Sequence, residues 1–417
     1  MFRNIDKAIA YIESKRHKNT IESFRRILEE LDINTKQKNM IHVAGTNGKG
    51  STVNYLRSIL NAHGYHVGTF TSPYMIKHND RIRIDDQPIS DEDLLALINK
   101  YETVIEEKNL SMFEIDVLIM LDYFSSHDLD YRIIECGIGG ANDKTNVIQP
   151  IISAITNIGN DHLDQIGPSL YDVINEKMGI IKEGQYFITS EVEGMVLARL
   201  QEQCDAMGAT MVVVPEYQVS RYPFHFRYRD MAFTLEKQGV YQVANARLAL
   251  TIANKLINLD EKTTEKAIEE AVWYGRFEVM NVAGHQVILD GAHNTDGVKA
   301  LLTTMQYMRT KDTVFIFSGL KDKDVDEMIE LIDEAGYPIY LTSFNDERAS
   351  DLEDYRSFST VTVVPHFAEA IKVALLKHDQ LVITGSLHFI SSVRKYLKQN
   401  LHVSLTFFYL KCNTCVV

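Results

Sequence analysis

Residues 40–52 read MIHVAGTNGKGST, an apolar run followed by a glycine-rich turn in which two hydroxyls come just after a lysine. The apolar run predicts a buried strand, and residues 50–63, directly after the turn, predict a helix. Such a turn favours phosphate, because its backbone N–H groups converge and the helix N-terminus adds partial positive charge. Lys49 would supply a full charge, while Ser51 or Thr52 could reach a magnesium ion. This stretch therefore predicts a nucleotide site in an α/β fold.

The loop departs in one place from the usual phosphate-loop pattern. In that pattern a Ser or Thr follows the lysine directly, whereas here Gly50 intervenes. A tight strand-to-helix turn with an exposed lysine is the alternative to a nucleotide site. Three glycines with a lysine, directly after a buried strand, favour the nucleotide site.

The size and composition are those of a globular protein with more than one domain. The chain has 417 residues, 45% of them hydrophobic and 24% charged, which predicts two or three domains with large cores. The 43 Lys and Arg residues against 57 Asp and Glu residues leave a net charge of −14. This balance argues against a general nucleic-acid or anionic-membrane surface, although a cleft can still carry local positive charge.

The chain ends and the cysteines indicate where the protein works. The N-terminal residues lack the apolar core of a signal peptide, and no stretch approaches the roughly 20 apolar residues of a membrane span. The four cysteines predict no disulfide framework, and Cys412 with Cys415 forms a single CxxC pair, too few ligands for zinc. We therefore expect a reduced, cytoplasmic protein that binds neither membrane nor nucleic acid.

The last residues, 401–417, are unusually apolar for a chain end. They could form a last strand or a tail that packs poorly against the rest of the protein.

Short apolar runs alternate with helical patterns along most of the chain. Such runs, without strict alternation, suit strands buried on both faces of a parallel sheet. The expected strands of the first set lie at 40–45, 66–72, 131–137, 151–158 and 186–190, and those of the second set lie at 285–291, 312–319, 338–343 and 380–386. The expected helices are two within 4–31 and one each at 50–63, 91–107, 113–127, 168–182, 193–207, 241–257, 261–273, 296–309, 323–335, 366–378 and 388–398. Residues 211–240 are aromatic and roughly alternating, which predicts a small antiparallel ribbon.

Alternation of this kind is typical of a doubly wound sheet. We expect an N-terminal P-loop ATPase-type doubly wound sheet with the small antiparallel insertion. A smaller C-terminal Rossmann-like α/β domain would follow. The restart of the pattern suggests a boundary near 276–284, so the expected domains are 1–280 and 281–417.

Polar loops follow three of the predicted strands at the sheet edge where doubly wound folds bind ligands. These loops are TSPYMIKHNDRI (71–82), ECGIGGANDKTN (135–146) and TNIGNDHLDQIG (156–167). Glu135 lies where an acidic residue after a parallel strand would hold magnesium, although it could equally be a capping residue. Asp161, His162 and Asp164 lie together in the third loop. A single histidine there would be structural more often than not, but three converging polar loops favour a site.

Two lysines, Lys177 and Lys182, lie near the end of a predicted helix. Lysines at a helix C-terminus favour the helix dipole, so a structural role is the simpler interpretation. In the second domain, LDGAHNTDG (289–297) places polar residues directly after a strand. This is the same arrangement as in the three polar loops of the first domain, and it too suggests the edge of a binding site. Asn245 lies at the head of a helix, and Arg276 lies at the proposed domain junction, where it could reach a bound phosphate.

Taken together, these motifs resemble the folylpolyglutamate synthase/dihydrofolate synthase family, which is related to the Mur ligases of cell-wall synthesis. The resemblance covers roughly residues 42–390 in the family's order. The matching stretches are HVAGTNGKGST, TSP…DRI, ECGIGGANDKTN, TNIGNDH, KMGIIK, NARLAL, GRFE, DGAHN and ITGSL. The intervening Gly50 is typical of the folate branch, whose loop resembles GTNGKGS, whereas Mur loops resemble GTNGKT.

This resemblance implies an ATP-dependent acid–amino-acid ligase that forms a C–N bond. ATP would phosphorylate a carboxylate of a folate or dihydropteroate substrate, and L-glutamate would attack the resulting acyl phosphate. The implied cofactors are ATP and Mg²⁺, and a monovalent cation such as K⁺ is a further candidate. Tetrahydrofolate polyglutamylation and conversion of dihydropteroate to dihydrofolate are both expected, and a monomer is expected.

The resemblance also implies roles for individual residues. The implied catalytic residues are Lys49, Lys177 and His162. The implied ATP-binding residues are Gly45, Thr46, Asn47, Gly48, Lys49, Gly50, Ser51, Thr52, Asn245, Arg276, Asp290 and His293. The implied magnesium ligands are Ser51, Ser72, Glu135, His162 and Lys177, the lysine being carbamylated so that it acts like a carboxylate. ATP contacts from both domains would imply closure over the substrates.

Several positions depart from the family pattern, and two other functions remain open. Tyr274 and Thr295 replace prolines, Lys144 replaces a frequent alanine, and Tyr74 replaces a frequent histidine. A Mur-type ligase acting on a UDP-linked muropeptide would need an N-terminal module, whereas about 40 residues precede the phosphate loop. A non-catalytic nucleotide switch would not need a second α/β domain bearing DGAHN.

Overall fold

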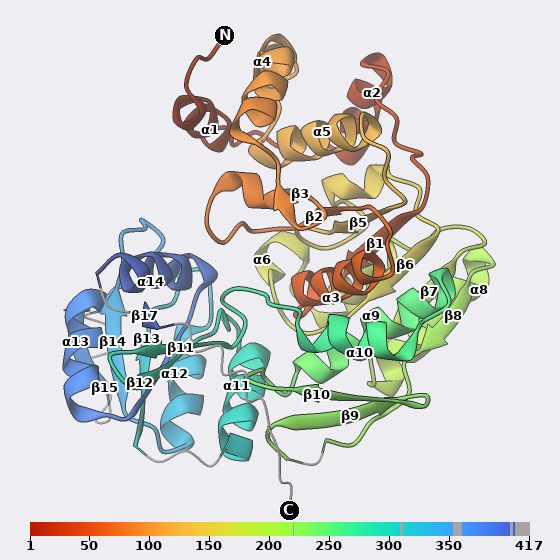
Figure 1. The fold of residues 1–417 in the computed structure, drawn as a ribbon. Helices are drawn as coiled ribbons and strands as arrows, with labels where there is room; N and C mark the ends of the chain where they lie inside the picture. The colour runs from red at the N-terminus through yellow and green to blue at the C-terminus, as the bar shows by residue number, and fades with distance from the viewer. Residues whose placement is uncertain (220, 309–311, 353–360, 401–402, 405–417) are drawn as a thin grey trace, which may run out of the picture. The chain divides into compact units, whose positions relative to one another are not determined.

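The computed structural model describes residues 1–219, 221–308, 312–352, 361–400 and 403–404. The chain divides into two compact units, each with its own sheet (Figure 1). The first unit comprises Met1–Glu236 and Val240–Trp273, and the second comprises Lys237–Gly239 and Tyr274–Val417. The domain limits predicted at 280 and 281, and the roles given to the two domains, stay predictions.

The first unit has a mixed sheet in which parallel strands predominate. Its described strands follow the order β4-β3-β2-β5-β1-β6-β7-β8. Their bounds are β1 (Met40–Ala44), β2 (Val67–Phe70), β3 (Ile82–Ile84), β4 (Gln87–Pro88), β5 (Tyr131–Glu135), β6 (Ile152–Ile155), β7 (Tyr186–Thr189) and β8 (Thr210–Val213). From β2 to β8 neighbouring strands run parallel, while β3 and β4 add an antiparallel edge. Every residue of β1 and β5 is buried, which confirms strands covered on both faces.

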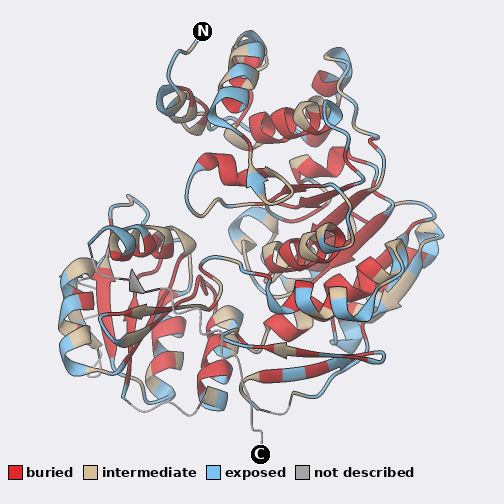
Figure 2. Ribbon diagram, viewed as in Figure 1, coloured by how far each residue is buried: buried red, intermediate tan, exposed pale blue. Residues whose placement is uncertain are grey.

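Helices cover both faces of this sheet, as predicted for a doubly wound fold. One cluster of buried residues combines α3, α9 and α10 with the sheet, and another combines α1, α2, α4 and α5 (Figure 2). A third cluster lies under α7 and α8. The helix bounds are α1 (Ile5–Glu13), α2 (Ile21–Glu30), α3 (Lys49–Ala62), α4 (Asp91–Glu107), α5 (Met112–Ser125), α6 (Leu163–Ile166), α7 (Leu170–Met178), α8 (Gly194–Met207), α9 (Gln242–Leu256) and α10 (Glu261–Glu269).

The predicted antiparallel ribbon exists, but it is shorter than residues 211–240. Its strands are β9 (Phe224–Tyr228) and β10 (Met231–Leu235), and alternate side chains are buried along β9. The beginning of the predicted segment instead forms β8, which pairs parallel with β7 at the edge of the main sheet. The run MVVV (211–214) does not alternate between apolar and polar residues. It therefore fits a parallel edge strand better than a ribbon with one solvent-exposed face.

The second unit also contains a mainly parallel sheet. Its described strands follow the order β15-β14-β13-β16-β12-β11-β17, with β11 and β17 antiparallel. Their bounds are β11 (Glu278–Val282), β12 (His285–Leu289), β13 (Thr313–Phe317), β14 (Ile339–Ser343), β15 (Val361–His366), β16 (Gln380–Thr384) and β17 (Val403–Ser404). The helices are α11 (Thr295–Met308), α12 (Val325–Glu334), α13 (Phe367–Lys377) and α14 (Leu387–Asn400).

Two strands of the second unit were missing from the sequence prediction. Strand β11 forms a hairpin with β12 through Ala283 and Gly284, both of which have positive φ. A residue pair of this kind is typical of a tight hairpin turn, but the segment lay at the expected domain boundary. Strand β15 precedes α13, where only the helix was predicted.

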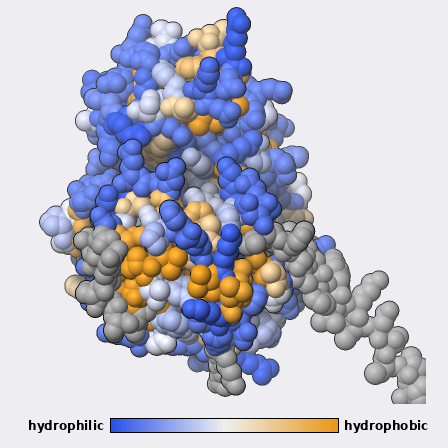
Figure 3. Space-filling model, turned by 90° about the vertical axis from the view of Figure 1, so that its left-hand side faces the viewer, coloured by the Kyte–Doolittle hydropathy of each residue, from blue (hydrophilic) through white to orange (hydrophobic). Residues whose placement is uncertain are grey.

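Part of the chain end lies outside the described residues. For residues 401–417 the sequence left open a last strand or a poorly fitting tail. Of these residues the structure describes only β17, which pairs with β11. Cys412 and Cys415 lie beyond it. No helix of the described residues is long and apolar enough to cross a membrane. Hydrophilic side chains cover most of the face in Figure 3, with hydrophobic ones gathered in its lower half.

Candidate active site

The glycine-rich turn between β1 and α3 has a shape that only small residues permit. Gly45 has a φ of +145° and Gly48 a φ of +86°, and helix α3 begins directly after Gly48. A Cβ on Gly45 would lie 1.8 Å from the Thr156 hydroxyl oxygen. A Cβ on Gly48 would lie 2.2 Å from the Asn245 side-chain oxygen. Residues far apart in sequence therefore close around the loop, and a larger side chain at either glycine would collide with them.

The loop is held in shape by residues that follow β6. The Thr46 amide donates to the Asn157 carbonyl at 2.9 Å, and the Asn47 amide donates to the Asn157 side chain at 2.9 Å. The Thr156 hydroxyl donates to the Asn47 carbonyl at 2.6 Å. The Gly159 amide donates to the Thr46 hydroxyl at 2.9 Å. The protein's own bonds thus set the loop geometry, which is the preorganisation that phosphate binding needs.

Two lysines converge on one carbonyl of this loop. Lys49 Nζ donates to the Gly45 carbonyl at 2.9 Å, and Lys177 Nζ donates to the same carbonyl at 3.0 Å. Lys177 lies in the last turn of α7 and is buried. Burial, followed by the nearby charge of Lys49, lowers the pKa of Lys177 to about 7. Lys177 therefore lies buried at the glycine-rich loop, with its pKa lowered, and its predicted catalytic and metal-binding roles stay predictions.

The intervening Gly50 lies where a carboxylate and an indole ring approach the loop. A Cβ at this position would be 3.2 Å from Trp273 Nε1 and 3.4 Å from Glu135 Oε2. Glu135 is buried at the end of β5 and accepts a hydrogen bond from the Ser72 amide at 3.1 Å. The Ser72 hydroxyl accepts from Arg81 Nη1 at 3.1 Å. Gly50, Glu135 and Ser72 are therefore close neighbours.

The glycine-rich loop after β5 is anchored by two acidic side chains. Asp143 accepts hydrogen bonds from the amides of Gly137 at 3.0 Å and Ile138 at 2.9 Å. Glu176, directly before Lys177, accepts from the amide of Asn142 at 2.7 Å. These anchors were not singled out from the sequence. The sequence nevertheless offered a signal, because Asp143 lies in the motif GGANDKTN (139–146) and Glu176 lies in NEKMG (175–179).

His162 lies at the start of α6 with a φ of +55°. Its amide donates to Asp161 Oδ1 at 2.9 Å, and its ring Nε2 lies 3.7 Å from Asp161 Oδ2. Across the described part of the chain, no group of three or more His, Cys, Asp and Glu side chains is arranged to hold a metal ion. The five predicted magnesium ligands thus stay a prediction.

The donor chemistry nevertheless fits Mg²⁺. This ion usually takes one or two carboxylates and completes its shell with phosphate oxygens and water. Glu135 supplies a buried carboxylate beside the phosphate loop. In α3, Ser51 is buried, and the Thr52 hydroxyl oxygen is buried without a hydrogen-bond partner among the described residues.

The remaining predicted nucleotide residues fall into two groups. Asn245 lies at the head of α9 against Gly48 and donates to Gln242 at 2.9 Å, so the structure brings it to the glycine-rich loop, and its ATP contact stays a prediction. In the second unit, Asp290 accepts from the Phe277 and Ala292 amides, each at 2.9 Å. This carboxylate shapes the turn after β12.

Two further residues of the second unit meet at this turn. Arg276 Nη1 donates to the Gly291 carbonyl at 3.3 Å, and His293 Nδ1 lies 2.9 Å from the same oxygen. The ATP contacts predicted for Arg276, Asp290 and His293 stay predictions.

Two family models match this chain. Residues 43–253 match the Mur ligase middle domain, and residues 275–387 match the Mur ligase glutamate ligase domain. Dihydrofolate synthase/folylpolyglutamate synthase from Bacillus subtilis is 35% identical over 407 residues, covering 90% of this chain and 94% of the relative. Folylpolyglutamate synthase from Lacticaseibacillus casei is 29% identical over 423 residues, covering 94% and 99% respectively.

Solved structures show the same fold. The apo form of L. casei FPGS superposes with a TM-score of 0.81 at 26% identity, covering 95% of this chain and all of that one. E. coli FolC in complex with DHPP and ADP superposes with a TM-score of 0.84 at 25% identity, covering 95% and 98%. The predicted fold class is confirmed.

A glycine-rich loop that opens a helix on a doubly wound sheet, in a chain that matches the Mur ligase middle and glutamate ligase domains, defines an ATP-dependent ligase of the Mur type. The enzyme is an acid–amino-acid ligase. The chain belongs to the dihydrofolate synthase/folylpolyglutamate synthase family, as its motifs predicted.

Proposed function

We propose that this enzyme adds L-glutamate to the carboxylate of a pterin substrate, using both dihydropteroate and reduced folates as acceptors. The observation that carries the proposal is the meeting of Lys49, Lys177 and the buried Glu135 at a preformed phosphate loop. The names of the relatives, which include both activities, support the pterin acceptor. Cytoplasmic location and a monomeric state stay predictions.

The reaction proceeds in two steps. A carboxylate oxygen of the acceptor attacks the γ-phosphorus of ATP, ADP leaves, and an acyl phosphate forms. The glutamate amine then attacks the acyl carbon, the C–O bond to phosphate breaks, and the amine loses a proton. Phosphoryl transfer needs positioning and charge neutralisation more than covalent help. The Lys49 ammonium and the loop amides would supply both.

Mg²⁺ would neutralise phosphate charge in this site, and Glu135 with Ser51 would hold it. Lys177 would act as a further oxygen ligand after carbamylation. Its neutral amine can attack CO₂, forming an N–C bond and releasing a proton. The low pKa of Lys177 supports this proposal, because an ammonium group has no lone pair with which to attack.

The decisive experiment incubates the purified enzyme with ATP, magnesium and labelled L-glutamate. Parallel reactions contain dihydropteroate, tetrahydrofolate or a UDP-muropeptide. We expect label in both pterin products and none in the muropeptide. Labelling of dihydropteroate alone would reject polyglutamylation, and labelling of tetrahydrofolate alone would reject dihydrofolate synthesis. Labelling of neither pterin by a folded enzyme would overturn the proposed function, and label in the muropeptide would favour the Mur-type alternative.

A further inference from the structure

A groove between β8, the β9–β10 ribbon and α9 has no part in the proposed reaction. Its lining residues all belong to the first unit, and its volume is about 1010 Å³. This volume is at the upper end of the range for small-molecule sites. The ribbon stood out in the sequence for its aromatic, alternating pattern, and the proposed function gives it no role. The groove is therefore a candidate for a second binding site.

The charge of the groove is opposite to that of the whole chain. Arg227, Arg229 and Arg247 line it, and Glu216 is the one carboxylate among its described lining residues. The chain as a whole has a net charge of −14. Within the described residues, the hydrogen bonds of Arg227 and Arg247 go to carbonyl oxygens and to no carboxylate. A group of cations without counter-charges attracts an anion.

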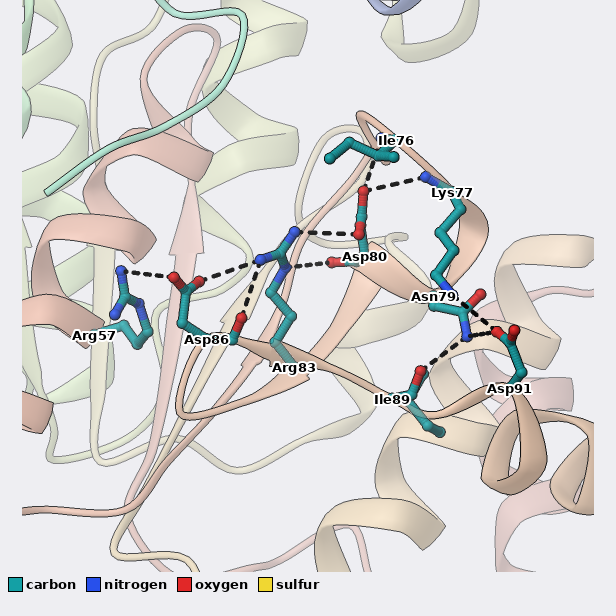
Figure 4. A network of polar contacts seen from close by, with 9 residues as sticks. All are labelled: Arg57, Ile76, Lys77, Asn79, Asp80, Arg83, Asp86, Ile89 and Asp91. Atoms are coloured by element: carbon teal, nitrogen blue, oxygen red, sulfur yellow. Dashed lines mark hydrogen bonds and ion pairs between the residues drawn. The ribbon is translucent and has the colours of Figure 1, made fainter. Parts of the chain in front are cut away.

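Arg83 on β3 shows how a partly buried arginine is neutralised elsewhere in this unit (Figure 4). Its guanidinium lies 3.2 Å from Asp80 Oδ1 and 3.2 Å from Asp86 Oδ1. Asp86 also lies 3.6 Å from a guanidinium nitrogen of Arg57 on α3. Each of these two arginines thus has a carboxylate beside it. No such carboxylate pairs with the arginines of the groove within the described residues.

Arg247 on α9 is the buried member of the group, with only 7% of it exposed. Its Nη1 donates to the Arg227 carbonyl, and its Nη2 donates to the Pro215 carbonyl at 3.1 Å. These bonds fix the guanidinium between β9 and the segment that follows β8. Its Nε is buried without a hydrogen-bond partner among the described residues. A guanidinium has five N–H donors, so several remain for a ligand.

Burial lowers the pKa of Arg247, and the titratable groups that act on it are Tyr217 and Tyr228, not carboxylates. A buried cation without a counter-charge destabilises the folded protein, because water no longer solvates it. A bound anion would remove this penalty by supplying the missing charge.

A purely structural role would make Arg247 a clamp between β9 and the segment after β8. The two carbonyl contacts fit that role, and so does the Tyr217 ring, whose centroid lies 5.4 Å from the guanidinium. A clamp does not account for the unpartnered Nε or for two further arginines at the same groove. These two observations favour a ligand site.

We propose that this groove binds a small organic oxyanion that carries several phosphate or carboxylate oxygens. Arg247 would hold one oxyanion group through its remaining N–H donors, because a guanidinium matches the spacing of carboxylate and phosphate oxygens. The exposed Arg227 and Arg229 would offset further charge. A nucleic acid is disfavoured, because a net charge of −14 repels an extended polyanion.

Hydrogen exchange of the full-length enzyme tests the site and locates it. Pyrophosphate and tricarballylate are titrated in parallel, so that recognition of phosphate and of carboxylate are distinguished. We expect at least one probe to slow exchange of the β9 and β10 amides, and the concentration dependence gives its Kd. Arg247→Met should raise this Kd about 10-fold or more. No protection of the ribbon by either probe, or an unchanged Kd in Arg247→Met, overturns the proposal.

The same measurement separates this groove from the phosphate loop. Pyrophosphate bound at the loop would protect the first turn of α3 instead of the ribbon. Protection of α3 should disappear in Lys49→Ala and persist in Arg247→Met. Protection of the ribbon should show the reverse pattern, and its loss in Lys49→Ala would overturn a separate site.

A further pair of variants separates binding from folding, because Arg247 also holds β9 in place. Arg227→Gln removes an exposed charge, so it should raise the Kd about 3-fold and leave the Tm unchanged. Arg26→Gln, at an exposed position of α2, is the matched control and should leave the Kd unchanged. Equal weakening by the two variants would show general charge attraction and overturn the proposal.

Glu216→Gln should have the opposite effect. This variant removes the lining carboxylate, so the anion should bind about 3-fold more tightly. Weaker or unchanged binding would contradict an anionic ligand. None of these measurements needs turnover, so the site in the groove and the ligase reaction can fail independently of each other.

Discussion

At the residue scale, the departure from the usual phosphate-loop pattern falls at Gly50, where side chains from distant parts of the chain approach the loop. The position lies in the first turn of α3, where alanine would favour the helix by roughly 0.5–1 kcal/mol. A side chain here would be crowded by Trp273 Nε1, which lies 3.2 Å from the missing Cβ, while Glu135 Oε2 lies at a contact distance of 3.4 Å. Glycine at this position thus lowers helix propensity but leaves room for Trp273 and Glu135.

We predict that Gly50→Ala lowers kcat/KM roughly 10- to 100-fold, because the added methyl displaces Glu135 or Trp273 by a few tenths of an ångström or more. The Tm should stay within a few degrees of that of the unaltered enzyme. Steady-state kinetics and thermal unfolding check both statements. Gly194→Ala, in open space at the start of α8, is the matched control. Full activity of Gly50→Ala would show that the loop tolerates the methyl group.

Lys177 carries the second prediction at this scale. Lys177→Ala should abolish glutamate addition, since it removes the group that is placed on the Gly45 carbonyl beside Lys49. Short carboxylates such as acetate should restore part of the rate if the working form is a carbamate. The exposed Lys255, changed to Ala, is the control. Carbon-13 NMR of enzyme in labelled bicarbonate should show a carbamate resonance that Lys177→Ala lacks, and retained activity in that variant would reject the role.

At the element scale, the buried His78 joins α1 and α5 to its own loop, residues 71–82. His78 Nδ1 lies 2.9 Å from Glu13 Oε1 on α1, and Nε2 lies 2.7 Å from Asp116 Oδ1 on α5. Burial alone would lower the pKa of His78, but the Asp116 and Glu13 carboxylates outweigh it and raise the pKa to about 9. The charged imidazolium therefore stabilises the packing of three elements at neutral pH.

This raised pKa predicts a specific pH dependence of stability. Because the folded pKa exceeds the unfolded value of about 6.5, the contribution is fully present below pH 6.5 and is lost as pH rises through about 9. The loss is on the order of 3 kcal/mol. Urea unfolding of the unaltered enzyme and of His78→Gln at about pH 6 and pH 10 should show the stability difference shrinking at high pH. His66→Gln, at an exposed ion pair with Asp85, is the control. Parallel curves for the unaltered enzyme and His78→Gln would contradict the assignment.

At the scale of the whole molecule, each unit has its own sheet and its own buried interior. In the second unit, Phe315 is fully buried in the middle of β13, with its ring centroid 5.0 Å from that of Tyr337. In the first unit, β1 and β5 lie between separate clusters of buried side chains. Damage to one interior should therefore remain largely confined to its unit.

Phe315→Ala tests this expectation. The change should cost about 3–5 kcal/mol in the second unit, since it removes a large ring from a close-packed interior. Hydrogen exchange should accelerate for amides of β12, β13 and β16, while those of β1 and β5 keep their protection. Equal acceleration in both sheets would show that the chain unfolds as one cooperative body.

The alternation of strands and helices, the glycine-rich loop and the family could all be predicted from the order of the residues alone. These features are local: hydrophobic period, glycine spacing and short motifs are legible over ten to fifteen residues. The lowered pKa of Lys177, the close neighbours of Gly50 and the limits of the ribbon became visible only in the folded chain. Each of those depends on groups that are distant in sequence, such as Lys49 beside Lys177, Trp273 beside Gly50 and β7 beside β8. Burial and long-range contact set pKa values, steric room and strand pairing, and neither can be read from a local pattern.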